Sequence, residues 1–436
     1  MNMPWTLARR TARNAAKPLD AVEVALADGL GLALASGVRA LASQPTCDTS
    51  AMDGYATAGP GPWTIVGRVA AGDPVPSVFL RCGEAFGVAT GAPVPDGADR
   101  VLPVEICAVD GALLTEAASA QCQHAACQHH DNCTRRVAPP HIGKHIRRRG
   151  EDWSAGDELI PAGSVVTPAV LGLAAGAGHD TLLVHRRPRV AVIVTGDELL
   201  HSGPPRPGRV RDAIGPMLPG LLAGAELLGT THLRDDPAAL ADALTFGAAD
   251  LLATTHPRDN PANAPTAADP LPANAPTFDT ADVLVTCGAT SVGPADHLRR
   301  LLADLGAEIL VSGVACRPGH PMLLAVLPDG RYVVGLPGNP FAALAAVLTL
   351  LRPLLDTLGG HTARPPVTAW LQDACAHPRD TRLVPVVRTG GEVVPAGHDR
   401  PGSLWGAALA DALAVVPPGH EGGEVELLTY AGQRPV

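Results

Sequence analysis

The sequence is poor in aromatic residues and in charged residues, and it has no excess of positive charge. Aromatic residues make up only 3% and charged residues 17% of the 436 positions, whereas hydrophobic residues make up 46%. A globular core must therefore be built largely from Ala, Val and Leu. The formal net charge of −10 and the lack of a long polybasic stretch argue against nucleic acid as a partner.

The sequence also lacks the features of membrane and secreted proteins. The apolar stretch from Phe341 to Leu351 is too short to span a bilayer, and residues 1–18 lack the apolar central region of a secretion signal. The nine cysteines are an odd number without a disulfide-like framework, which favours reduced thiols. These absences predict a cytoplasmic protein that has no membrane partner.

The chain is too long for one hydrophobic core, so three or four structural units are expected. Apolar positions at helical spacing from Leu19 to Leu41 predict one or two helices, and short Val- and Ile-rich runs from Trp63 to Glu105 predict strands. The predicted units are a discontinuous helical and β linker (residues 1–44 and 142–185), a small β-rich unit (45–141), an α/β unit (186–365) with a Pro-rich insertion at 255–280, and a β-rich unit (366–436).

The α/β unit is predicted from apolar strands that alternate with helices. The strands are expected at Val190–Thr195, at Asp282–Cys287 and in the segments ILVSGV and RYVVGLP, and the helices at Gly215–Gly229, Pro237–Thr245, Asp296–Leu305 and Pro340–Leu355. Such alternation favours a parallel, doubly wound sheet. The predicted fold class is therefore a multidomain α/β protein in which a doubly wound unit is joined to β-rich units.

Polar and glycine-rich loops follow three of these strands. They are Thr195-Gly196-Asp197-Glu198, the segment CGATSVGPAD with Ser291 and Gly293, and Pro337-Gly338-Asn339-Pro340. Ligands of α/β proteins bind at the carboxyl ends of strands, where glycines let backbone amides approach an anion. Each loop alone could be turn chemistry. Their occurrence at successive strand ends favours phosphate or oxyanion binding.

Seven motifs occur in a fixed order along nearly the whole chain. They are SAMDGYA (Ser50–Ala56), ATGAPVPDGADRVLPVE (Ala89–Glu105), RRRGED (Arg147–Asp152), TGDEL (Thr195–Leu199), SVGPAD (Ser291–Asp296), RPGHP (Arg317–Pro321) and GLPGNP (Gly335–Pro340). The set resembles the MoeA family, to which the C-terminal domain of gephyrin is similar, and RPGHP resembles a divergent subgroup. Each motif is modestly specific, whereas seven in order make coincidence implausible.

The resemblance implies an elongated homodimer whose protomers have four domains, with molybdopterin bound by the α/β domain. The active cleft would lie between this domain of one protomer and the β-rich second domain of its partner. The implied reaction is that of a molybdopterin molybdenumtransferase: molybdate-derived molybdenum enters adenylylated molybdopterin, AMP is released, and Mg²⁺ assists. A molybdopterin adenylyltransferase would be a possible partner.

The resemblance also assigns residues. Asp53, Glu151 and Asp197 would be the catalytic carboxylates, and Asp197 and Glu151 would hold Mg²⁺. The residues expected to bind the pterin, nucleotide or molybdate are Thr90, Gly91, Asp212, Ser291, Gly293, Arg317, His320, Gly338, Asn339 and Ser403. Asp212 is in addition a weaker fourth candidate among the carboxylates.

Three positions depart from the family pattern. His320 stands where the family usually has lysine, so anion binding is expected to weaken as the imidazole loses its proton through the neutral pH range. Ala289 replaces a usual glycine, and Ile214 follows Asp212-Ala213 where a hydroxyl and Asn are common. Two alternatives therefore remain, a non-catalytic scaffold of the same fold and a tungsten-inserting paralogue, while adenylyl transfer ranks last.

One insertion concentrates potential soft metal ligands. Cys122, Cys127 and Cys133 stand among several histidines, and such ligands could chelate Zn²⁺ or copper. Their spacing forms no CxxC knuckle, so a flexible insertion in a hairpin loop is the stronger interpretation.

Overall fold

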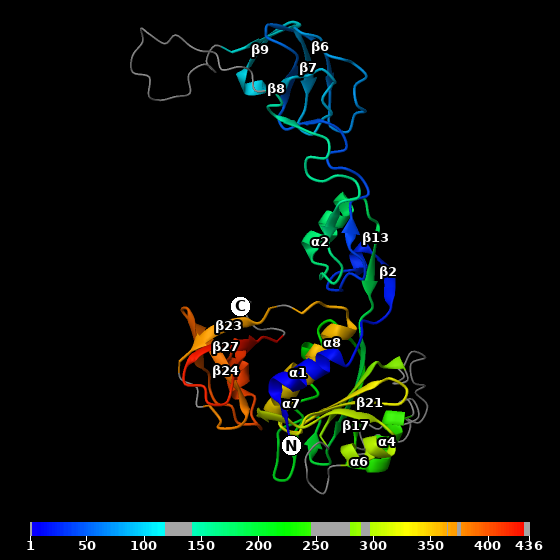
Figure 1. The fold of residues 1–436 in the computed structure, drawn as a ribbon, viewed down its shortest axis with the longest axis vertical. Helices are drawn as coiled ribbons and strands as arrows, with labels where there is room; N and C mark the ends of the chain where they lie inside the picture. The colour runs from blue at the N-terminus through cyan, green and yellow to red at the C-terminus, as the bar shows by residue number, and fades with distance from the viewer. Residues whose placement is uncertain are drawn as a thin grey trace.

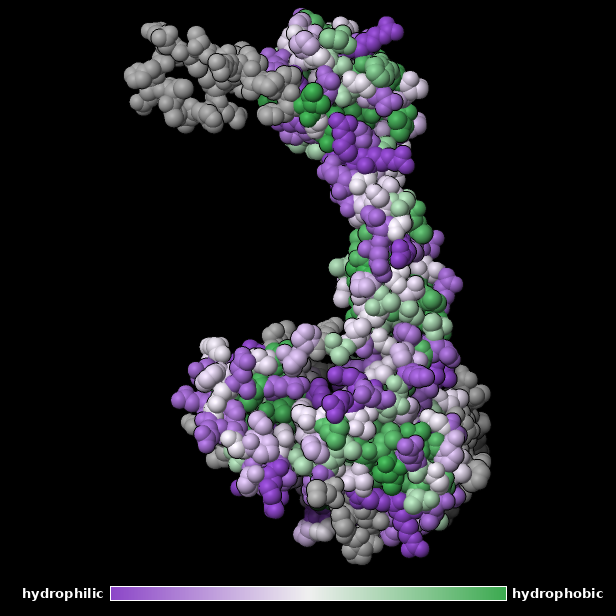
Figure 2. Space-filling view, in the orientation of Figure 1, coloured by the Kyte–Doolittle hydropathy of each residue, from purple (hydrophilic) through white to green (hydrophobic). Residues whose placement is uncertain are grey.

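The computed structural model describes residues 2–117, 142–245, 280–288, 297–363, 365–372 and 376–430. The chain is elongated, with a β-rich unit at one end, a narrow middle and two units side by side at the broad end (Figure 1). Figure 2 shows a band of hydrophilic residues where the β-rich end joins the narrow middle. The multidomain α/β fold class predicted from sequence is confirmed.

The α/β unit contains a six-stranded sheet in the order β17, β14, β18, β22, β21, β19. The first four strands are parallel to one another, whereas β21 runs antiparallel to both of its neighbours, β22 and β19, so the sheet is mixed where a parallel one was predicted. Only a short turn around Gly330 connects β21 to β22, and a parallel connection needs a crossover of about a dozen residues or more. The strands are β14 (Arg189–Thr195), β17 (Glu226–Leu233), β18 (Val283–Cys287), β19 (Glu308–Ser312), β21 (Leu323–Val326) and β22 (Tyr332–Leu336).

Helices cover both faces of this sheet, as the doubly wound prediction requires. Successive residues of a strand point to opposite faces, so Val190 and Val192 pack in one core cluster and Ala191 and Ile193 in another. The helices are α1 (Trp5–Asn14), α3 (Leu218–Leu221), α7 (Pro340–Ala346) and α8 (Arg352–Leu358) on the first face, and α4 (Pro237–Thr245) and α6 (Leu298–Asp304) on the second.

The most apolar helix of the described residues is continuous from Pro340 to Leu358, longer than the predicted Phe341–Leu351 stretch. It joins α7 to α8 through a π-helical turn at Val347–Leu351. By length and composition it could cross a membrane, but 83% of its most apolar window is buried inside the protein. It is therefore a buried helix in the core cluster that contains Val190 and Val192.

Helix α1 packs in this core, which corrects the prediction that residues 1–44 belong to the linker. Trp5 is 3% exposed, and Ala8 and Ala12 are fully buried in the same cluster as Val190. The Trp5 indole N–H donates to the Thr349 hydroxyl at 3.0 Å in the helix opposite. The first residues of the chain are thus fixed to a helix near the end of the α/β unit.

Replacing Thr349 by valine is expected to lower the free energy of unfolding of the α/β unit by about 1–3 kcal/mol. The shape is kept, but the buried Trp5 N–H loses its acceptor. Urea unfolding followed by tryptophan fluorescence measures the change. The matched control is Thr245→Val, whose exposed hydroxyl also donates to the carbonyl four residues earlier and should cost under about 0.5 kcal/mol. Equal losses in the two variants would contradict the role of the Trp5 contact.

The helix predicted between Leu19 and Leu41 is wrong. Residues Ala21–Ala25 form β2, which pairs with β13 (Thr181–His185), and Val38–Arg39 form β3, which pairs with β12 (Glu158–Ile160). The segment AVEVA alternates in exposure, which is the period of a strand, and a 3₁₀ turn at Leu26–Asp28 interrupts it. Helix α2 (Pro168–Gly176) follows β12 and is capped by Thr167, whose hydroxyl accepts the Val170 N–H.

The helix predicted at Gly215–Gly229 is also wrong. Only the short α3 forms, and the chain enters β17 at Glu226. Pro216, Pro219 and three glycines interrupt helical spacing here, and the following ELLGTTHL is suited to a strand. The helices predicted at Pro237–Thr245 and Asp296–Leu305 are confirmed, within two residues, as α4 and α6.

Two further large sheets lie in the two β-rich segments, both of which were expected, and several two-stranded pairs accompany them in the described fold. The β-rich end contains a six-stranded sheet, whose strands in order are β8 (Arg100–Pro103), β5 (Gly54–Thr57), β7 (Glu84–Val88), β6 (Trp63–Val69), β10 (Leu113–Glu116) and β9 (Cys107–Asp110). The C-terminal sheet consists of β1 (Met3–Pro4), β20 (Val314–Arg317), β24 (Thr381–Thr389), β25 (Glu392–Pro395), β23 (Val367–Leu371), β27 (Gly423–Leu428) and β26 (Ala412–Val416). Because β1 and β20 join it, this sheet continues into the α/β unit. The other domain boundaries expected from the sequence stay predictions.

Candidate functional site

The loops that follow β14, β18 and β22 are in direct contact. The Thr195 hydroxyl donates to the Cys287 carbonyl at 3.2 Å, and the Gly288 N–H donates to the Leu336 carbonyl at 3.1 Å. A Cβ placed on Gly288 would lie 2.7 Å from the Thr195 hydroxyl oxygen, and one on Gly338 would lie 3.9 Å from the Gly288 Cα. Strand ends that lie apart in the sequence thus form one continuous backbone surface at the carboxyl edge of the sheet.

Gly288→Ala is expected to destabilise the protein by about 1–2 kcal/mol more than Gly330→Ala. Both glycines have φ near +90°, so both alanines are strained, but only the Cβ at position 288 would collide with Thr195. Nothing lies within 4 Å of a Cβ at Gly330. Thermal unfolding of the two variants compares them. Identical melting temperatures would show that the two loops do not depend on their close approach.

Asp197 lies exposed on the loop after β14. Its carboxylate accepts from the Arg234 Nε at 3.2 Å, its N–H donates to Asp235 at 3.3 Å, and its carbonyl accepts from Arg209. The loop is therefore held by its neighbours while the side chain stays 53% exposed. An exposed carboxylate with a single arginine partner can exchange that partner for a cation.

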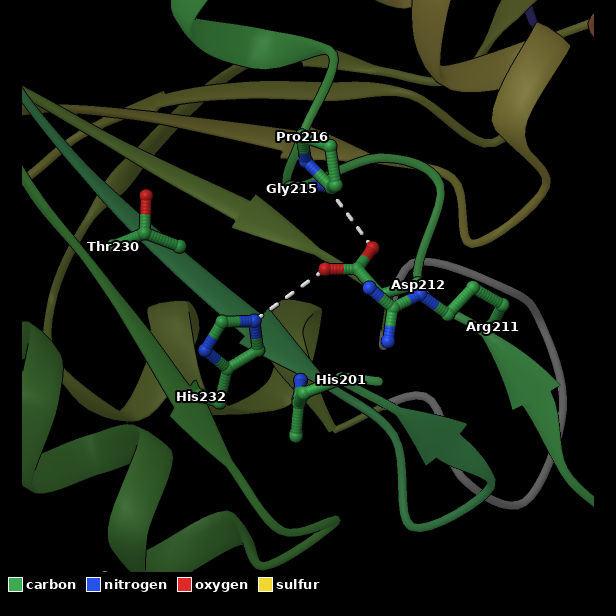
Figure 3. Close-up of a pocket in the computed structure, with 7 residues that line it drawn as sticks. All are labelled: His201, Arg211, Asp212, Gly215, Pro216, Thr230 and His232. Atoms are coloured by element: carbon green, nitrogen blue, oxygen red, sulfur yellow. Dashed lines mark hydrogen bonds and ion pairs between the residues drawn. The ribbon is translucent and has the colours of Figure 1, made fainter. Parts of the chain in front are cut away.

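Asp212 is buried in the wall of a pocket of about 210 Å³ beside this loop (Figure 3). One carboxylate oxygen accepts the N–H groups of Ile214 and Gly215, at 2.9 and 3.0 Å, and the other faces the His232 Nε2 at 3.4 Å. Burial alone raises the pKa of the Asp212 carboxyl, but these hydrogen bonds outweigh burial and hold the pKa below its ordinary value. Asp212 is therefore a carboxylate at neutral pH.

His201 and His232 line the same pocket, and neither was singled out in the sequence. Their ring centroids are 4.1 Å apart, with an angle of 68° between the ring planes. Burial, and next the neighbouring His232, lowers the pKa of His201. Each residue is an isolated histidine in the sequence, and only the fold brings the two together.

The C-terminal unit reaches the start of helix α7. The Phe341 N–H donates to the Pro401 carbonyl at 2.9 Å, and a Cβ on Gly402 would lie 3.6 Å from the Asn339 side-chain oxygen. The Ser403 hydroxyl accepts the Trp405 N–H at 3.2 Å. The structure thus brings the loop of Ser403 to Asn339. Because the Phe341 amide is occupied, it is not available to the anion predicted at this helix start.

The RPGHP turn packs on the same helix. Gly319, at φ +107°, lies so close that a Cβ would be 3.2 Å from the Ala342 carbonyl. Arg317 and His320 are both exposed, and the Arg317 Nε donates to Asp380 at 2.8 Å. Asp380, which also lies 3.4 Å from the His377 ring nitrogen, was missed in the sequence because no motif marks it.

In the β-rich end, the SAMDGYA and ATGAPV motifs meet. The Thr90 N–H donates to the Asp53 carboxylate at 2.8 Å, and the Gly91 N–H donates to the Ser50 carbonyl at 2.8 Å. Gly91 has φ +78°, a conformation that favours glycine. Asp53, Thr90 and Gly91 are all exposed, so they form one polar edge of this unit.

Glu151 lies in a turn whose two ends pair with residues 44–50, Arg147 with Thr49 and Trp153 with Gln44. Its carboxylate accepts the Arg148 N–H at 2.7 Å, and the Arg148 side chain in turn pairs with Asp48. The RRRGED run is therefore a folded turn that is tied to residues 45–48. Arg147 pairs with Asp152 and Arg148 with Asp48, although the turn remains exposed.

In the described part of one chain, the three predicted catalytic carboxylates do not lie close together. Asp53 adjoins β5, in the sheet at the far end of the molecule, whereas Asp197 follows β14 at the broad end (Figure 1). Several predicted residues lie outside the described part of the chain: Ser291, Gly293, Ala289, Cys122, Cys127, Cys133 and, except for Thr280, the 255–280 insertion.

Comparisons with known proteins give a consistent result. Residues 3–178 match the family described as MoeA N-terminal region (domain I and II), and residues 191–256 and 253–357 match the probable molybdopterin binding domain. The chain is 33% identical to molybdopterin molybdenumtransferase 2 of Mycobacterium tuberculosis over 421 residues, which cover 91% of each chain. It is 28% identical to the molybdopterin molybdenumtransferase of a Nostoc species over 76% of this chain and 67% of that protein.

Solved structures share the fold. A molybdopterin biosynthesis moeA protein from Pyrococcus horikoshii superposes with a TM-score of 0.73 at 24% identity, covering 99% of this chain and 100% of that chain. A second structure of the moeA protein from this organism gives 0.69 at 20% identity over the same shares. The similarity extends over the β-rich end, the narrow middle and the broad end alike.

Proposed function

Because the chain belongs to the MoeA family, we propose that it is a molybdopterin molybdenumtransferase of molybdenum cofactor biosynthesis that inserts molybdate-derived molybdenum into adenylylated molybdopterin and releases AMP. The observation that carries the proposal is the contact among the loops after β14, β18 and β22. Backbone N–H groups beside glycine, with Asp197 exposed at the same edge, suit a polyanionic substrate that is handled together with a cation.

The substrate would bind along this edge and along the start of α7. Gly338 and Asn339 would offer backbone and amide groups to a phosphate, and Ser403 would approach from the C-terminal unit. Arg317 and His320 would receive molybdate, which is a substrate and not a resident cofactor. Because Asp380 already pairs with Arg317, part of this positive charge is balanced before the anion arrives. Tungstate has nearly the same size and charge, so a tungsten-inserting paralogue is the alternative.

Mg²⁺ fits the carboxylates proposed for it. Asp197 and Glu151 are exposed; in the described part of the chain the Asp197 carboxylate accepts from the Arg234 side chain, and the Glu151 carboxylate accepts the Arg148 N–H. Hard oxygen ligands of this kind suit Mg²⁺, which would polarise the phosphate group of the substrate when bound. Asp53 would add a third carboxylate.

The distance between these residues in one chain makes a homodimer part of the proposal. The polar edge formed by Asp53, Thr90 and Gly91 would face the strand-end loops of a second copy. A molybdopterin adenylyltransferase would supply the substrate, and the reaction would take place in the cytoplasm.

The proposal is tested by measuring AMP release from adenylylated molybdopterin in the presence of molybdate and Mg²⁺, for the wild type and Asp53→Ala. Molybdate-dependent release that is lost in the variant is the expected result. Substrate binding without release in both proteins would instead favour the non-catalytic scaffold. Faster release with tungstate than with molybdate would favour the paralogue.

A further inference from the structure

Two histidines to which the proposed reaction gives no role meet Asp212 in one pocket. β15 (Leu199–Leu200) pairs in parallel with β16 (Val210–Arg211), so the residues that follow, His201 and Asp212, lie side by side. The Asp212 N–H donates to the Leu200 carbonyl at 3.1 Å. His232 projects from the end of β17 into the same pocket (Figure 3).

The three side chains point their donor atoms at one another. One nitrogen of each histidine and one oxygen of Asp212 all lie within 4.8 Å of one another. The Asp212 Oδ2 and the His232 Nε2 are 3.4 Å apart, and two ligand atoms of a tetrahedral zinc ion stand about 3.3–3.6 Å apart. The His201 nitrogen lies within 4.8 Å of both of these atoms, and its side chain is exposed.

The backbone holds the carboxylate in the orientation that a metal ligand needs. The N–H groups of Ile214 and Gly215 both donate to Asp212 Oδ1, which leaves Oδ2 directed at His232. A Cβ on Gly215 would lie 2.4 Å from Oδ2, so glycine at this position keeps space for the carboxylate. Hydrogen bonds to the ligating groups commonly fix the geometry of a metal site in this way.

We propose that His201, Asp212 and His232 form a binding site for a divalent first-row transition metal such as Zn²⁺. Two imidazole nitrogens and one carboxylate oxygen suit Zn²⁺ and its neighbours, whereas Mg²⁺ prefers oxygen ligands and retained water. Three protein ligands leave a coordination position open towards the pocket of about 210 Å³. The site is separate from the cysteine-containing insertion, and it does not rest on the proposed transferase reaction.

Arg211 supports a competing interpretation, in which the pocket binds an anion and not a metal cation. This exposed arginine lines the same pocket, and its guanidinium donates to the Leu200 carbonyl at 3.5 Å. A cation at the rim would favour an oxyanion such as molybdate. The buried carboxylate of Asp212 opposes this, because an anion in the pocket would face a negative charge that is only 7% exposed. The observations therefore favour the metal cation.

The test is calorimetric titration of the full chain, stripped with a chelator, with Zn²⁺. The background variant carries Cys122→Ser, Cys127→Ser and Cys133→Ser together with His124→Ala, His129→Ala and His130→Ala, so that these potential ligands of the insertion do not contribute. We expect one strong site per chain, weakened by more than about 10–100-fold in His201→Ala and in His232→Ala. Thr230→Ala, which alters another pocket side chain without removing one of the three ligands, should leave the affinity unchanged. Both histidines are exposed, so these variants should fold; circular dichroism checks this.

Two outcomes overturn the proposal. One is the absence of a strong Zn²⁺ site in the background variant, or a site whose affinity is the same after either histidine is replaced. The other is that the background variant binds molybdate but not Zn²⁺ and that His232→Ala removes this binding, which would make the pocket an anion site. Each readout is metal or anion binding alone, so a failure here leaves the proposed transferase activity to be judged by AMP release.

Discussion

Asp197→Asn is expected to reduce molybdenum insertion by on the order of 10²–10³-fold, the size of effect that follows removal of one electrostatic group from an active site. Asparagine keeps the shape and can still contact Arg234, but it loses the negative charge that would hold Mg²⁺ beside the substrate. The measurement is the rate of AMP release at saturating molybdate and Mg²⁺.

Glu198→Gln is the matched control, because it removes the same charge from the next residue of the same loop. Its rate should stay close to that of the wild type. Circular dichroism and the elution volume on size exclusion should be unchanged in both variants. Near-normal AMP release by Asp197→Asn would remove this residue from the mechanism, and equal losses in both variants would mean that only the overall charge of the loop matters.

Mixing Asp53→Ala with Asp197→Asn is expected to restore activity that neither variant has alone. In the proposed homodimer each cleft takes Asp53 from one protomer and Asp197 from the other. A mixed dimer then contains one cleft with both carboxylates and one with neither. Random exchange of protomers makes half of the dimers mixed, so the rate should recover to roughly a quarter of the wild-type value.

The control for this experiment is a mixture of Asp197→Asn with Asp197→Asn carrying a different affinity tag, which should stay inactive after exchange. Purification through two tags isolates the mixed dimer of the test pair. An inactive mixed dimer, with its composition verified, would contradict a cleft shared between protomers. Activity of the separate variants in dilute, monomeric solution would contradict it equally.

Much of the α/β unit could be predicted from sequence because its strands are short apolar runs that end in glycine-rich loops. The rule that ligands bind at carboxyl strand ends directed the search for a site to the loops of Thr195, Gly288 and Gly338, and the structure shows that these loops are in contact. The prediction of a helix at Leu19–Leu41 was wrong because the apolar residues of this segment also fall at helical spacing. In the structure they belong to strands whose residues alternate in exposure.

The side-chain clusters could not be predicted in the same way. His201 follows β15 and His232 lies in β17, and Asp380 reaches Arg317 only because β20 joins the C-terminal sheet next to β24. Such contacts depend on the order of the strands in the sheet, and a local sequence pattern does not indicate that order. The separation of Asp53 from Asp197 was implied by family resemblance, since no periodicity or composition indicates how far the β-rich end extends.

The docking of α1 has a consequence for how the chain folds during synthesis. Trp5 is translated 344 positions before its partner Thr349. The α/β core therefore cannot close until most of the chain has been translated, and until then the apolar face of α1 must remain uncovered or be protected by a chaperone. Contacts of such long range slow folding. The β-rich end, whose sheet is complete by Glu116 within the described strands, can fold much earlier.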